Sequence, residues 1–353
     1  MTVMVTGGLG FIGSAFVRRW RIFEDEPLVI VDFNGYAANY RNVEPWRNKD
    51  VLLIEDIADS RHIREAIHGY SPRAIIHFAA ESHVDNSIEN TNPFLHSNVY
   101  GTVNLLDQVL RVNKDILFLH VSTDEVFGSL GLTDPAFNEN TPYAPRSPYA
   151  ASKASSDHFV KAYRNTHGLK TIITNCSNNY GPYQHPEKFI PTVILNALQD
   201  RPVPIYGNGM NMRDWLHVDD HVNALMNILE RGRVGEQYCI GGGTQKTNIE
   251  LALNILGALG KPMDLIKFVE DRKGHDFRYD IDSDKLYLDT GWKPFTSFTH
   301  SLLKTVRWYQ DNLEWVKSCR SASESYSQAA KARAFIPPHL QPQNRFFPST
   351  TSL

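Results

Sequence analysis

The chain has 353 residues, enough for about two domains. It is 42% hydrophobic and 21% charged, which is ordinary for a globular protein whose core needs neither disulfides nor a structural metal. The 36 basic and 39 acidic residues leave a net charge of −3, which argues against a protein that binds nucleic acid or a membrane surface but leaves room for a local basic pocket.

Short apolar runs alternate with amphipathic segments over the first 180 residues. The runs are continuous rather than alternating in hydrophobicity, as expected where helices cover both faces of a parallel sheet. We therefore predict an α/β fold with a doubly wound parallel (Rossmann) sheet over residues 1–180. The predicted strands are 3–6, 28–32, 51–55, 74–78, 116–122 and 171–174, and the predicted helices are 11–20, 60–68, 93–112 and 148–167.

After residue 180 the alternation fades and Gly, Pro and Asn become frequent, which indicates loops. Helical patterns return at 188–199, 218–231, 247–258 and 298–313. We predict that residues 181–320 form mainly a smaller substrate-binding domain, with some chain returning to the sheet. Residues 321–353 are rich in Ser, Gln, Pro and Ala and are expected to be a tail, either disordered or an arm on a partner subunit.

A glycine-rich loop joins the first predicted strand to the first predicted helix. Its sequence, Gly7-Gly-Leu-Gly-Phe-Ile-Gly13, fits both the GxGxxG and GxxGxxG patterns. Glycines here allow a tight turn and let the N–H groups of the helix start approach a pyrophosphate. A glycine turn without a ligand can have the same sequence, but the strand before this loop and the helix after it favour a dinucleotide site.

An acidic residue, Asp32, ends the second predicted strand. A carboxylate at this place accepts hydrogen bonds from the ribose 2′-hydroxyl of NAD and repels the 2′-phosphate of NADP, so we predict NAD as the cofactor. The alternative is that Asp32 only caps a turn. Asp56, after the third predicted strand, can reach the adenine amino group or cap the following helix.

A tyrosine and a lysine, Tyr149 and Lys153, lie four residues apart in the predicted helix 148–167 and so face the same side of it. The Lys153 ammonium is expected to lower the pKa of the Tyr149 phenol, whose phenolate can then remove an alcohol proton beside a nicotinamide ring. On spacing alone, a surface tyrosine and a solvated lysine are the commoner interpretation.

Three consecutive polar residues, Thr123, Asp124 and Glu125, come at the end of the predicted strand 116–122. Catalytic groups in doubly wound folds lie beyond the carboxyl ends of the strands. Two adjacent carboxyl groups in one pocket should differ in pKa, because their like charges disfavour double ionisation. One can then serve as an acid and the other as a base. The alternative for the pair by itself is a loop whose acids cap the next element.

These groups occur together with further strings that resemble one family. The strings include Tyr36-Ala-Ala-Asn39, His77-Phe-Ala-Ala-Glu-Ser-His-Val-Asp85, Asn178-Asn-Tyr-Gly-Pro182, Pro186-Glu-Lys-Phe-Ile-Pro191, Arg213-Asp-Trp-Leu-His-Val218 and Arg272-Lys-Gly-His-Asp276. From residue 2 to residue 315 the chain resembles the extended short-chain dehydrogenase/reductases that act on nucleotide sugars, and within them the dTDP-glucose 4,6-dehydratases. Asp124 is the residue that best separates the dehydratases from the rest of the family, since its epimerases and decarboxylases usually carry other residues there.

The resemblance implies an NAD-dependent lyase reaction on a nucleotide-diphosphate-glucose. Tyr149 would take the proton of the sugar 4-hydroxyl, Glu125 the C5 proton, and Asp124 would protonate the departing 6-hydroxyl. Thr123 would hydrogen-bond the 4-oxygen and Lys153 would hold the nicotinamide ribose. Water leaves across C5–C6, and the product is a 4-keto-6-deoxyglucose nucleotide.

The resemblance also implies two sets of binding residues. The cofactor set is Gly7, Gly10, Phe11, Ile12, Gly13, Asp32, Asn34, Asp56, Ile57, Ala79, Ala80, Ser82, Asn98, Tyr149, Lys153 and Asn179. The substrate set is Ser82, Thr123, Asn178, Lys188, Phe189, Pro204, Tyr206, Arg213, Asn248, Arg272 and His275. The cations of the second set suit a diphosphate. Trp215, Trp292 and Trp308 are expected to be packing residues.

The three cysteines, Cys176, Cys239 and Cys319, are far apart and show no zinc-ligand spacing. We therefore predict no disulfide and no metal site, and we expect a reducing, cytoplasmic location. The start of the chain lacks the basic and apolar regions of a signal peptide, and no apolar stretch has the length of a transmembrane helix.

Several alternatives stay open. The nucleotide is dTDP or UDP, because Asn86 stands where the family usually has Arg. An epimerase or decarboxylase on the same scaffold, or a non-catalytic NAD-binding protein, are competing readings. The family suggests a homodimer through segments 93–112 and 148–167, but the apolar face formed by Val103, Leu106, Val109 and Leu110 fits burial within the monomer equally well.

Overall fold

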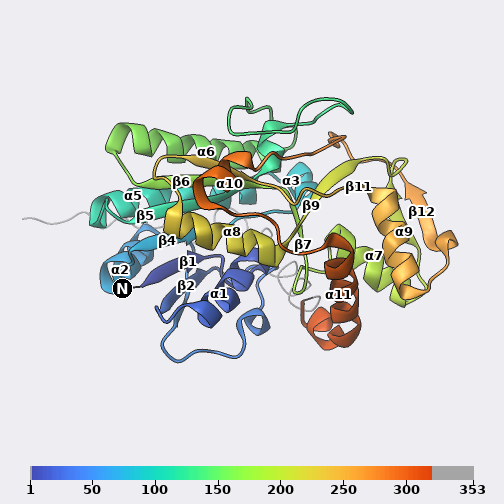
Figure 1. Ribbon diagram of the computed structural model, residues 1–353. Helices are drawn as coiled ribbons and strands as arrows, with labels where there is room; N and C mark the ends of the chain where they lie inside the picture. The colour runs from blue at the N-terminus through green and yellow to red at the C-terminus, as the bar shows by residue number, and fades with distance from the viewer. Residues whose placement is uncertain (1, 320–353) are drawn as a thin grey trace, which may run out of the picture.

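The computed structural model describes residues 2–319, and its largest feature is a seven-stranded sheet (Figure 1). The strands are parallel and follow the order β10-β6-β5-β4-β1-β2-β3. This arrangement confirms the predicted doubly wound α/β fold. The strands are β1 (Val3–Thr6), β2 (Leu28–Asp32), β3 (Val51–Ile54), β4 (Ala74–His77), β5 (Leu117–Thr123), β6 (Thr171–Cys176) and β10 (Gln237–Ile240).

Helices cover both faces of this sheet. Successive strand residues point to opposite faces, so Val5 packs in one hydrophobic core and Met4 in the other. Each strand is therefore apolar on both sides, which explains the continuous hydrophobic runs of the sequence. The helices around the first core are α1 (Phe11–Phe23), α8 (Val218–Arg231) and α10 (Asp284–Thr290), and those around the second are α2 (Ser60–Tyr70), α5 (Thr102–Val112) and α6 (Pro148–His167).

The later part of the chain builds a second layer of structure beside the carboxyl ends of the large sheet. It holds a three-stranded sheet of order β11-β9-β7 and a two-stranded sheet of order β12-β8, packed with helices around a separate core. However, β10 is a strand of the large sheet, and α8 packs in the first core of that sheet. The elements of the second layer are β7 (Asn178–Tyr180), α7 (Phe189–Leu198), β8 (Val203–Tyr206), β9 (Met212–His217), β11 (Gln245–Thr247), α9 (Asn248–Leu259), β12 (Ile266–Val269) and α11 (Phe298–Asp311).

The segment predicted as one helix over 93–112 has three parts in the structure. A short α4 (Asn92–Phe94) leads into the π-helical turn η2 (Leu95–Gly101), and α5 follows. π-helical turns inside helices are rare and frequent at functional sites. Here the turn holds Asn98, whose side chain lies in the protein interior, 1% exposed. The remaining short helices are η1 (Tyr40–Val43), α3 (Val84–Glu89), η3 (Asp124–Phe127) and η4 (Met263–Leu265).

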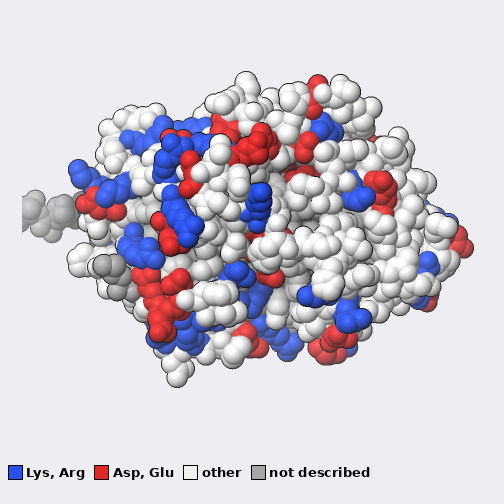
Figure 2. Space-filling view, viewed as in Figure 1, with Lys and Arg blue, Asp and Glu red and all other residues white. Residues whose placement is uncertain are grey.

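Figure 2 shows basic and acidic side chains interspersed over the visible face, in line with the small net charge. Among residues 2–319, no helix is long and apolar enough to span a bilayer. The predicted tail, residues 321–353, lies outside the described residues.

Candidate active site

Two adjoining cavities open at the carboxyl ends of the large sheet. The larger, of about 700 Å³, runs from the glycine loop after β1 to the ends of β5 and β6. The smaller, of about 340 Å³, lies between that point and the second layer of structure. Glu125, Asn178 and Lys188 belong to the walls of both. A molecule in one cavity can therefore meet a molecule in the other beside Glu125.

The glycine loop closes one end of the larger cavity. Gly7 has a φ of +70°, and a Cβ there would lie 2.6 Å from the Ala79 nitrogen. Gly10 is the N-cap of the 13-residue helix α1, and it lines the cavity together with the first turn of that helix. The partial positive charge of a helix N-terminus at a wall built of bare backbone suits a pyrophosphate.

Asp32 lies in the same wall at the end of β2 and is 7% exposed. Its Oδ2 accepts a hydrogen bond from the Leu9 nitrogen at 2.9 Å, and its Oδ1 accepts one from the Asn34 nitrogen at 2.9 Å. These bonds fix the carboxylate beside the phosphate-binding turn. Burial raises the pKa of Asp32 despite them. The residues present therefore fit a dinucleotide with a free ribose 2′-hydroxyl, as NAD has.

The glycine turn gives a first testable prediction. Replacing Gly13 with Ala should destabilise the protein by about 1–3 kcal/mol and reduce its content of bound NAD. A Cβ on Gly13 would lie 2.3 Å from the Gly7 carbonyl oxygen, so the whole turn must shift. Thermal unfolding and the cofactor absorbance of the purified protein measure both effects.

Gly257→Ala is the matched control, because a Cβ at this position in α9 meets no atom within 4 Å. This variant should keep its NAD and be at least as stable as the parent, since Ala favours a helix over Gly. Equal NAD contents in the Gly13→Ala and Gly257→Ala proteins would contradict the role of the turn.

Most of the predicted cofactor residues line the larger cavity, but Asn34 and Asn98 do not. The Asn34 backbone nitrogen donates to Asp32 Oδ1, so Asn34 orients a residue of the wall without lining the cavity itself. Asn98 accepts from the Glu81 nitrogen at 2.8 Å and donates to the Glu81 carbonyl and the Ser152 hydroxyl, so it fixes the loop that carries Ala79 and Ala80. The predicted residues in the wall are Gly7, Gly10, Phe11, Ile12, Gly13, Asp32, Asp56, Ile57, Ala79, Ala80, Ser82, Tyr149, Lys153 and Asn179.

Asp56 is not the cap of the following helix, because Asp59 fills that position. Its Oδ1 accepts from the Ala58 nitrogen, and its Oδ2 lies 2.9 Å from His96 Nε2. The carboxylate lies in the cavity wall.

The three polar residues after β5 lie where the two cavities meet. The Thr123 hydroxyl caps the short helix η3 by accepting from the Glu125 nitrogen at 3.3 Å, and it donates to Asp124 Oδ1 at 3.2 Å. Asp124 is 1% exposed, and its Oδ2 is buried without a hydrogen-bond partner among the described residues. Such an atom is suited to bind a polar group of a ligand.

The two carboxyl groups differ as predicted. Burial, and then the nearby Glu125, raise the pKa of Asp124 well above its usual range. Burial also raises the pKa of Glu125, but Arg213 opposes this rise. The stronger rise in pKa makes Asp124 the better candidate for the acid of the pair, and the Arg213 charge makes Glu125 the better candidate for the base.

Tyr149 and Lys153 lie on one face of α6 and line the larger cavity. Lys153 Nζ donates to the Val121 carbonyl at 2.9 Å. The predicted lowering of the Tyr149 pKa is not what the surrounding protein groups produce. Burial raises the pKa of Tyr149 well above its usual value, and the acids Glu125 and Asp124, with Cys176, add to the rise.

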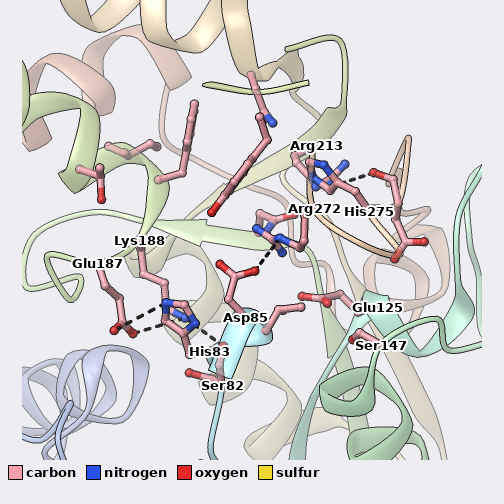
Figure 3. Close-up of a pocket in the computed structure, with 18 of the residues that line it drawn as sticks. Ser82, His83, Asp85, Glu125, Ser147, Glu187, Lys188, Arg213, Arg272 and His275 are labelled. Atoms are coloured by element: carbon pink, nitrogen blue, oxygen red, sulfur yellow. Dashed lines mark hydrogen bonds and ion pairs between the residues drawn. The ribbon is translucent and has the colours of Figure 1, made fainter. Parts of the chain in front are cut away.

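The smaller cavity holds the cations of the predicted substrate set (Figure 3). Arg213 donates to the backbone carbonyls of Met212 and Asp276. Because these acceptors are neutral, the two contacts do not compensate the positive charge of Arg213. Arg272 forms an ion pair of 2.9 Å with Asp85 across the cavity. Lys188 Nζ donates to the Ser82 carbonyl at 2.9 Å. Three cations around a cavity of this size suit a diphosphate.

All predicted substrate residues line one or both cavities. Thr123 lies in the larger one only, and Ser82, Asn178 and Lys188 lie in both. The residues confined to the smaller cavity are Phe189, Pro204, Tyr206, Arg213, Asn248, Arg272 and His275.

Some wall residues escaped the sequence analysis. Trp215, expected to be a packing residue, lines the smaller cavity, and its Nε1 is buried without a hydrogen-bond partner among residues 2–319. Glu187 and Asp85 lie within the quoted family strings but were given no role. Glu187 accepts from the Tyr36 hydroxyl at 3.0 Å, and the nearby His185 and Lys188 hold its pKa low, at about 2, against the effect of burial.

The last described segment also reaches the larger cavity. Trp315 lies in its wall, and Trp315 Nε1 donates to Asn42 Oδ1 at 2.7 Å. Asn39 Nδ2 donates to the Ser318 hydroxyl at 2.9 Å and lies 3.3 Å from Cys319 Sγ. The end of the described chain therefore holds the loop that follows Asp32. No motif in the sequence marks this contact.

Comparisons with known proteins agree with this geometry. A family profile described as GDP-mannose 4,6 dehydratase matches residues 4–305. The dTDP-glucose 4,6-dehydratase of Neisseria meningitidis serogroup B is 46% identical over 342 residues, which cover 91% of this chain and 96% of the relative. The dTDP-glucose 4,6-dehydratase DesIV of Streptomyces venezuelae, solved with NAD and TYD bound, superposes with a TM-score of 0.87 at 43% identity, over 90% of this chain and 100% of that one.

Solved structures of enzymes with another activity are also similar. The UDP-glucose 4-epimerase of Thermotoga maritima, solved with UDP-glucose, gives a TM-score of 0.83 at 25% identity, over 89% of this chain and all of its own. The scaffold is thus shared across activities, and the residues at the junction of the cavities must distinguish between them.

Proposed function

The chain belongs to the GDP-mannose 4,6 dehydratase family, and we propose that it converts dTDP-glucose into dTDP-4-keto-6-deoxyglucose and water with NAD as its bound cofactor. One observation carries the choice of reaction. A buried Asp124, whose pKa is raised well above its usual range, lies beside Glu125 at the junction of a dinucleotide cavity and a cation-lined cavity. Dehydration needs both an acid and a base at this place, whereas epimerisation at C4 needs neither.

Bound NAD would supply reversible hydride chemistry, accepting a hydride from the sugar and giving it back later in the reaction. Gly7, Gly10 and Gly13 would hold its pyrophosphate at the start of α1. Asp32 would hold the ribose of the adenosine half, and Lys153 that of the nicotinamide half.

Tyr149 acts first, as the base that takes the proton of the sugar 4-hydroxyl while C4 is oxidised. Burial and the nearby acids raise the pKa of Tyr149 in the protein alone, so positive charge close to its hydroxyl would favour the loss of its proton. Thr123, one residue before the acid pair, donates a hydrogen bond to the 4-oxygen.

The acid pair acts next. A ketone at C4 makes the C5 proton removable, and Glu125 takes it. Asp124 gives its proton to the 6-hydroxyl, so that water departs and a C5–C6 double bond forms. When C6 is then reduced, Glu125 returns its proton to C5. The proton that Tyr149 took from the 4-hydroxyl replaces the one that Asp124 gave to the departing water, so both groups are restored. The sugar has lost one water, and the reaction involves no net oxidation.

The cations of the smaller cavity would bind the nucleotide diphosphate. Arg213 faces the cavity from β9, and Arg272 would exchange its ion pair with Asp85 for one with a phosphate. The strong similarity to dTDP-glucose 4,6-dehydratases supports dTDP over UDP, although Asn86 departs from the usual Arg of that family.

A side-by-side rate comparison tests this proposal. The enzyme is incubated with dTDP-glucose and with UDP-glucose, and the 4-keto product is followed by its absorbance in alkali. We expect turnover of dTDP-glucose at a kcat/KM at least ~10-fold higher, the difference that about 1.4 kcal/mol of discrimination produces. A galactose-type product would instead establish an epimerase. Equal rates, or faster turnover of UDP-glucose, would refute the choice of nucleotide.

The proposal includes a homodimer. Leu106 and Val109, part of the apolar face noted in the sequence, are fully buried in the monomer core and do not support it. Other side chains do. Leu95, Tyr100 and Phe159 are 50%, 55% and 40% exposed on η2 and α6, which pack against each other. Large apolar groups exposed together are typical of a protein interface.

The proposal also includes a cytoplasmic location. Cys176, Cys239 and Cys319 are free and buried in the structure, as suits a protein of a reducing compartment.

A further inference from the structure

A fully buried carboxylate, Asp157, lies on the same helix as the two catalytic residues of α6. It follows Tyr149 by eight positions and Lys153 by four, so all three share one helix face. Its side chain is 0% exposed. Unpaired carboxylates avoid such places, because burial disfavours the charged form strongly. The groups around it must therefore explain why an acid stands there.

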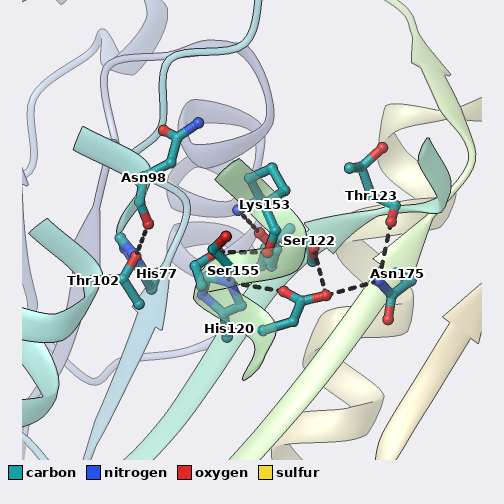
Figure 4. Close-up of polar contacts among 12 residues, drawn as sticks. His77, Asn98, Thr102, His120, Ser122, Thr123, Lys153, Ser155 and Asn175 are labelled. Carbon is teal, nitrogen blue, oxygen red and sulfur yellow. Dashed lines mark hydrogen bonds and ion pairs between the residues drawn. The ribbon is translucent and has the colours of Figure 1, made fainter. Parts of the chain in front are cut away.

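Donors from two strands and a loop converge on Asp157, and Figure 4 labels the strand residues His120, Ser122 and Asn175 among them. Its Oδ2 accepts from the Ser122 hydroxyl at 3.0 Å, the Tyr143 hydroxyl at 2.8 Å and Asn175 Nδ2 at 3.2 Å. Its Oδ1 lies 3.2 Å from His120 Nε2. Hydrogen bonds of this number stabilise the ionised form. Burial raises the pKa of Asp157, but His120, Lys153 and the Tyr143 hydroxyl together outweigh this effect, so the pKa lies below its usual value.

The same contacts connect α6 to the catalytic turn. Ser122 directly precedes Thr123, and Asn175 Nδ2 also donates to the Thr123 carbonyl at 3.0 Å. Lys153 Nζ donates to the Val121 carbonyl one residue earlier on β5. The carboxylate therefore lies behind the strand end that presents Thr123, Asp124 and Glu125.

Among the charged groups around Lys153, Asp157 raises the pKa of the Lys153 ammonium the most. Lys153 is 4% exposed, and burial lowers its pKa, whereas Asp157 is the first of the groups that oppose this lowering, followed by Cys176. The other titratable groups behind Lys153 are His77 and His120. Burial lowers the pKa of both, to about 4 for His120, so both are neutral near pH 7.

The remaining titratable neighbours do not supply a competing charge behind Lys153. Tyr143 and Tyr149 are neutral because burial raises the pKa of each phenol. Burial likewise raises the pKa of the Cys176 thiol to about 12, and Lys161 titrates on the opposite side of Asp157. Asp124 and Glu125 lie at the cavity wall in front.

We propose that Asp157 is a positioning residue, which keeps Lys153 an ammonium and fixes helix α6 to the end of β5. This inference rests on the proposed function, since it assigns Asp157 to the oxidation step of that reaction. It concerns a residue that touches neither cavity.

The test is the pH dependence of kcat/KM in the full-length, NAD-loaded Asp157→Asn protein. The amide keeps the size but removes the charge, so the pKa of Lys153 falls further. Activity that needs the ammonium is present below this pKa and is lost as the pH rises through it. The alkaline limb, meaning the fall of kcat/KM at high pH, should therefore move to lower pH by roughly one unit or more. An alkaline limb at the parent position, with activity reduced equally at every pH, would overturn the proposal.

Tyr143→Phe is the matched control. It removes the hydroxyl that lies 2.8 Å from Asp157 Oδ2 but leaves the carboxylate charge in place. This variant should unfold at a lower temperature and keep the alkaline limb of the parent. A limb that moves equally in both variants would show that packing, not charge, is responsible.

A second measurement does not depend on activity. In Lys153→Met the Asp157 carboxylate loses the Lys153 charge but keeps its hydrogen bonds, so Asp157→Asn should lower the unfolding temperature less in Lys153→Met than in the parent. An equal or larger decrease in Lys153→Met would refute the pairing. If the parent protein shows no dehydratase turnover while this stability result holds, the reaction assignment fails and the charge pairing stands.

Discussion

The Tyr149→Phe protein is expected to keep its bound NAD and lose at least ~10³-fold in kcat. General base catalysis by a positioned side chain contributes about 10²–10⁴-fold, and Tyr149 is the group assigned to take the proton of the 4-hydroxyl. The phenol is buried at the wall of the larger cavity, and its loss removes no charge. Turnover of dTDP-glucose and the absorbance of NAD in the purified protein are the two readouts.

Tyr180→Phe is the control for this substitution. Tyr180 is 1% exposed and its hydroxyl lies 2.6 Å from that of Ser301, within the separate core of the second layer. Its replacement should destabilise the protein by about 1 kcal/mol, as the loss of one buried hydrogen bond does, and leave kcat near the parent value. Parent-like turnover in Tyr149→Phe would remove Tyr149 from the mechanism.

The Asp124→Asn protein is expected to oxidise C4 but to release water at least ~10²-fold more slowly. Burial keeps Asp124 protonated, so the substitution exchanges one neutral group for another of similar size. Folding and Tyr149 are undisturbed, but an amide cannot give a proton to the 6-hydroxyl. In a single turnover, the reduced cofactor should form at the parent rate and then persist.

Glu125→Gln separates the two acids further. In deuterated water, Asp124→Asn still has the base that exchanges the C5 proton of the oxidised sugar, whereas Glu125→Gln does not. Mass spectrometry of recovered sugar should therefore find deuterium at C5 with the first variant only. Deuterium in both, or loss of C4 oxidation in Asp124→Asn, would contradict this division of roles.

Elements whose ends are fixed by neighbouring residues could be predicted from the sequence. Helix α6 spans Pro148–His167, the predicted range, because Ser147 caps its start with a bond to the Ala150 nitrogen and Gly168 adopts a φ of +71° after its end. The glycine loop and Asp32 were predictable for the same reason, since strand, turn and helix follow each other directly.

Features that depend on distant contacts could not be predicted. The π-helical turn around Asn98 exists where that side chain meets Glu81 and Ser152, and no local pattern marks it. The spacing of Tyr149 and Lys153 suggested a lowered phenol pKa, but the acids that raise it come from η3, on another part of the chain. Trp215 resembled a core residue, and only the fold shows that it borders a cavity.

The contact between Trp315 and Asn42 joins residues 273 positions apart. A ribosome makes the glycine turn and Asp32 long before it makes Trp315, which belongs to the wall of the same cavity. A nascent chain therefore cannot form the finished wall until Trp315 has been made. Chains that end before Trp315 would lack this part of the dinucleotide compartment.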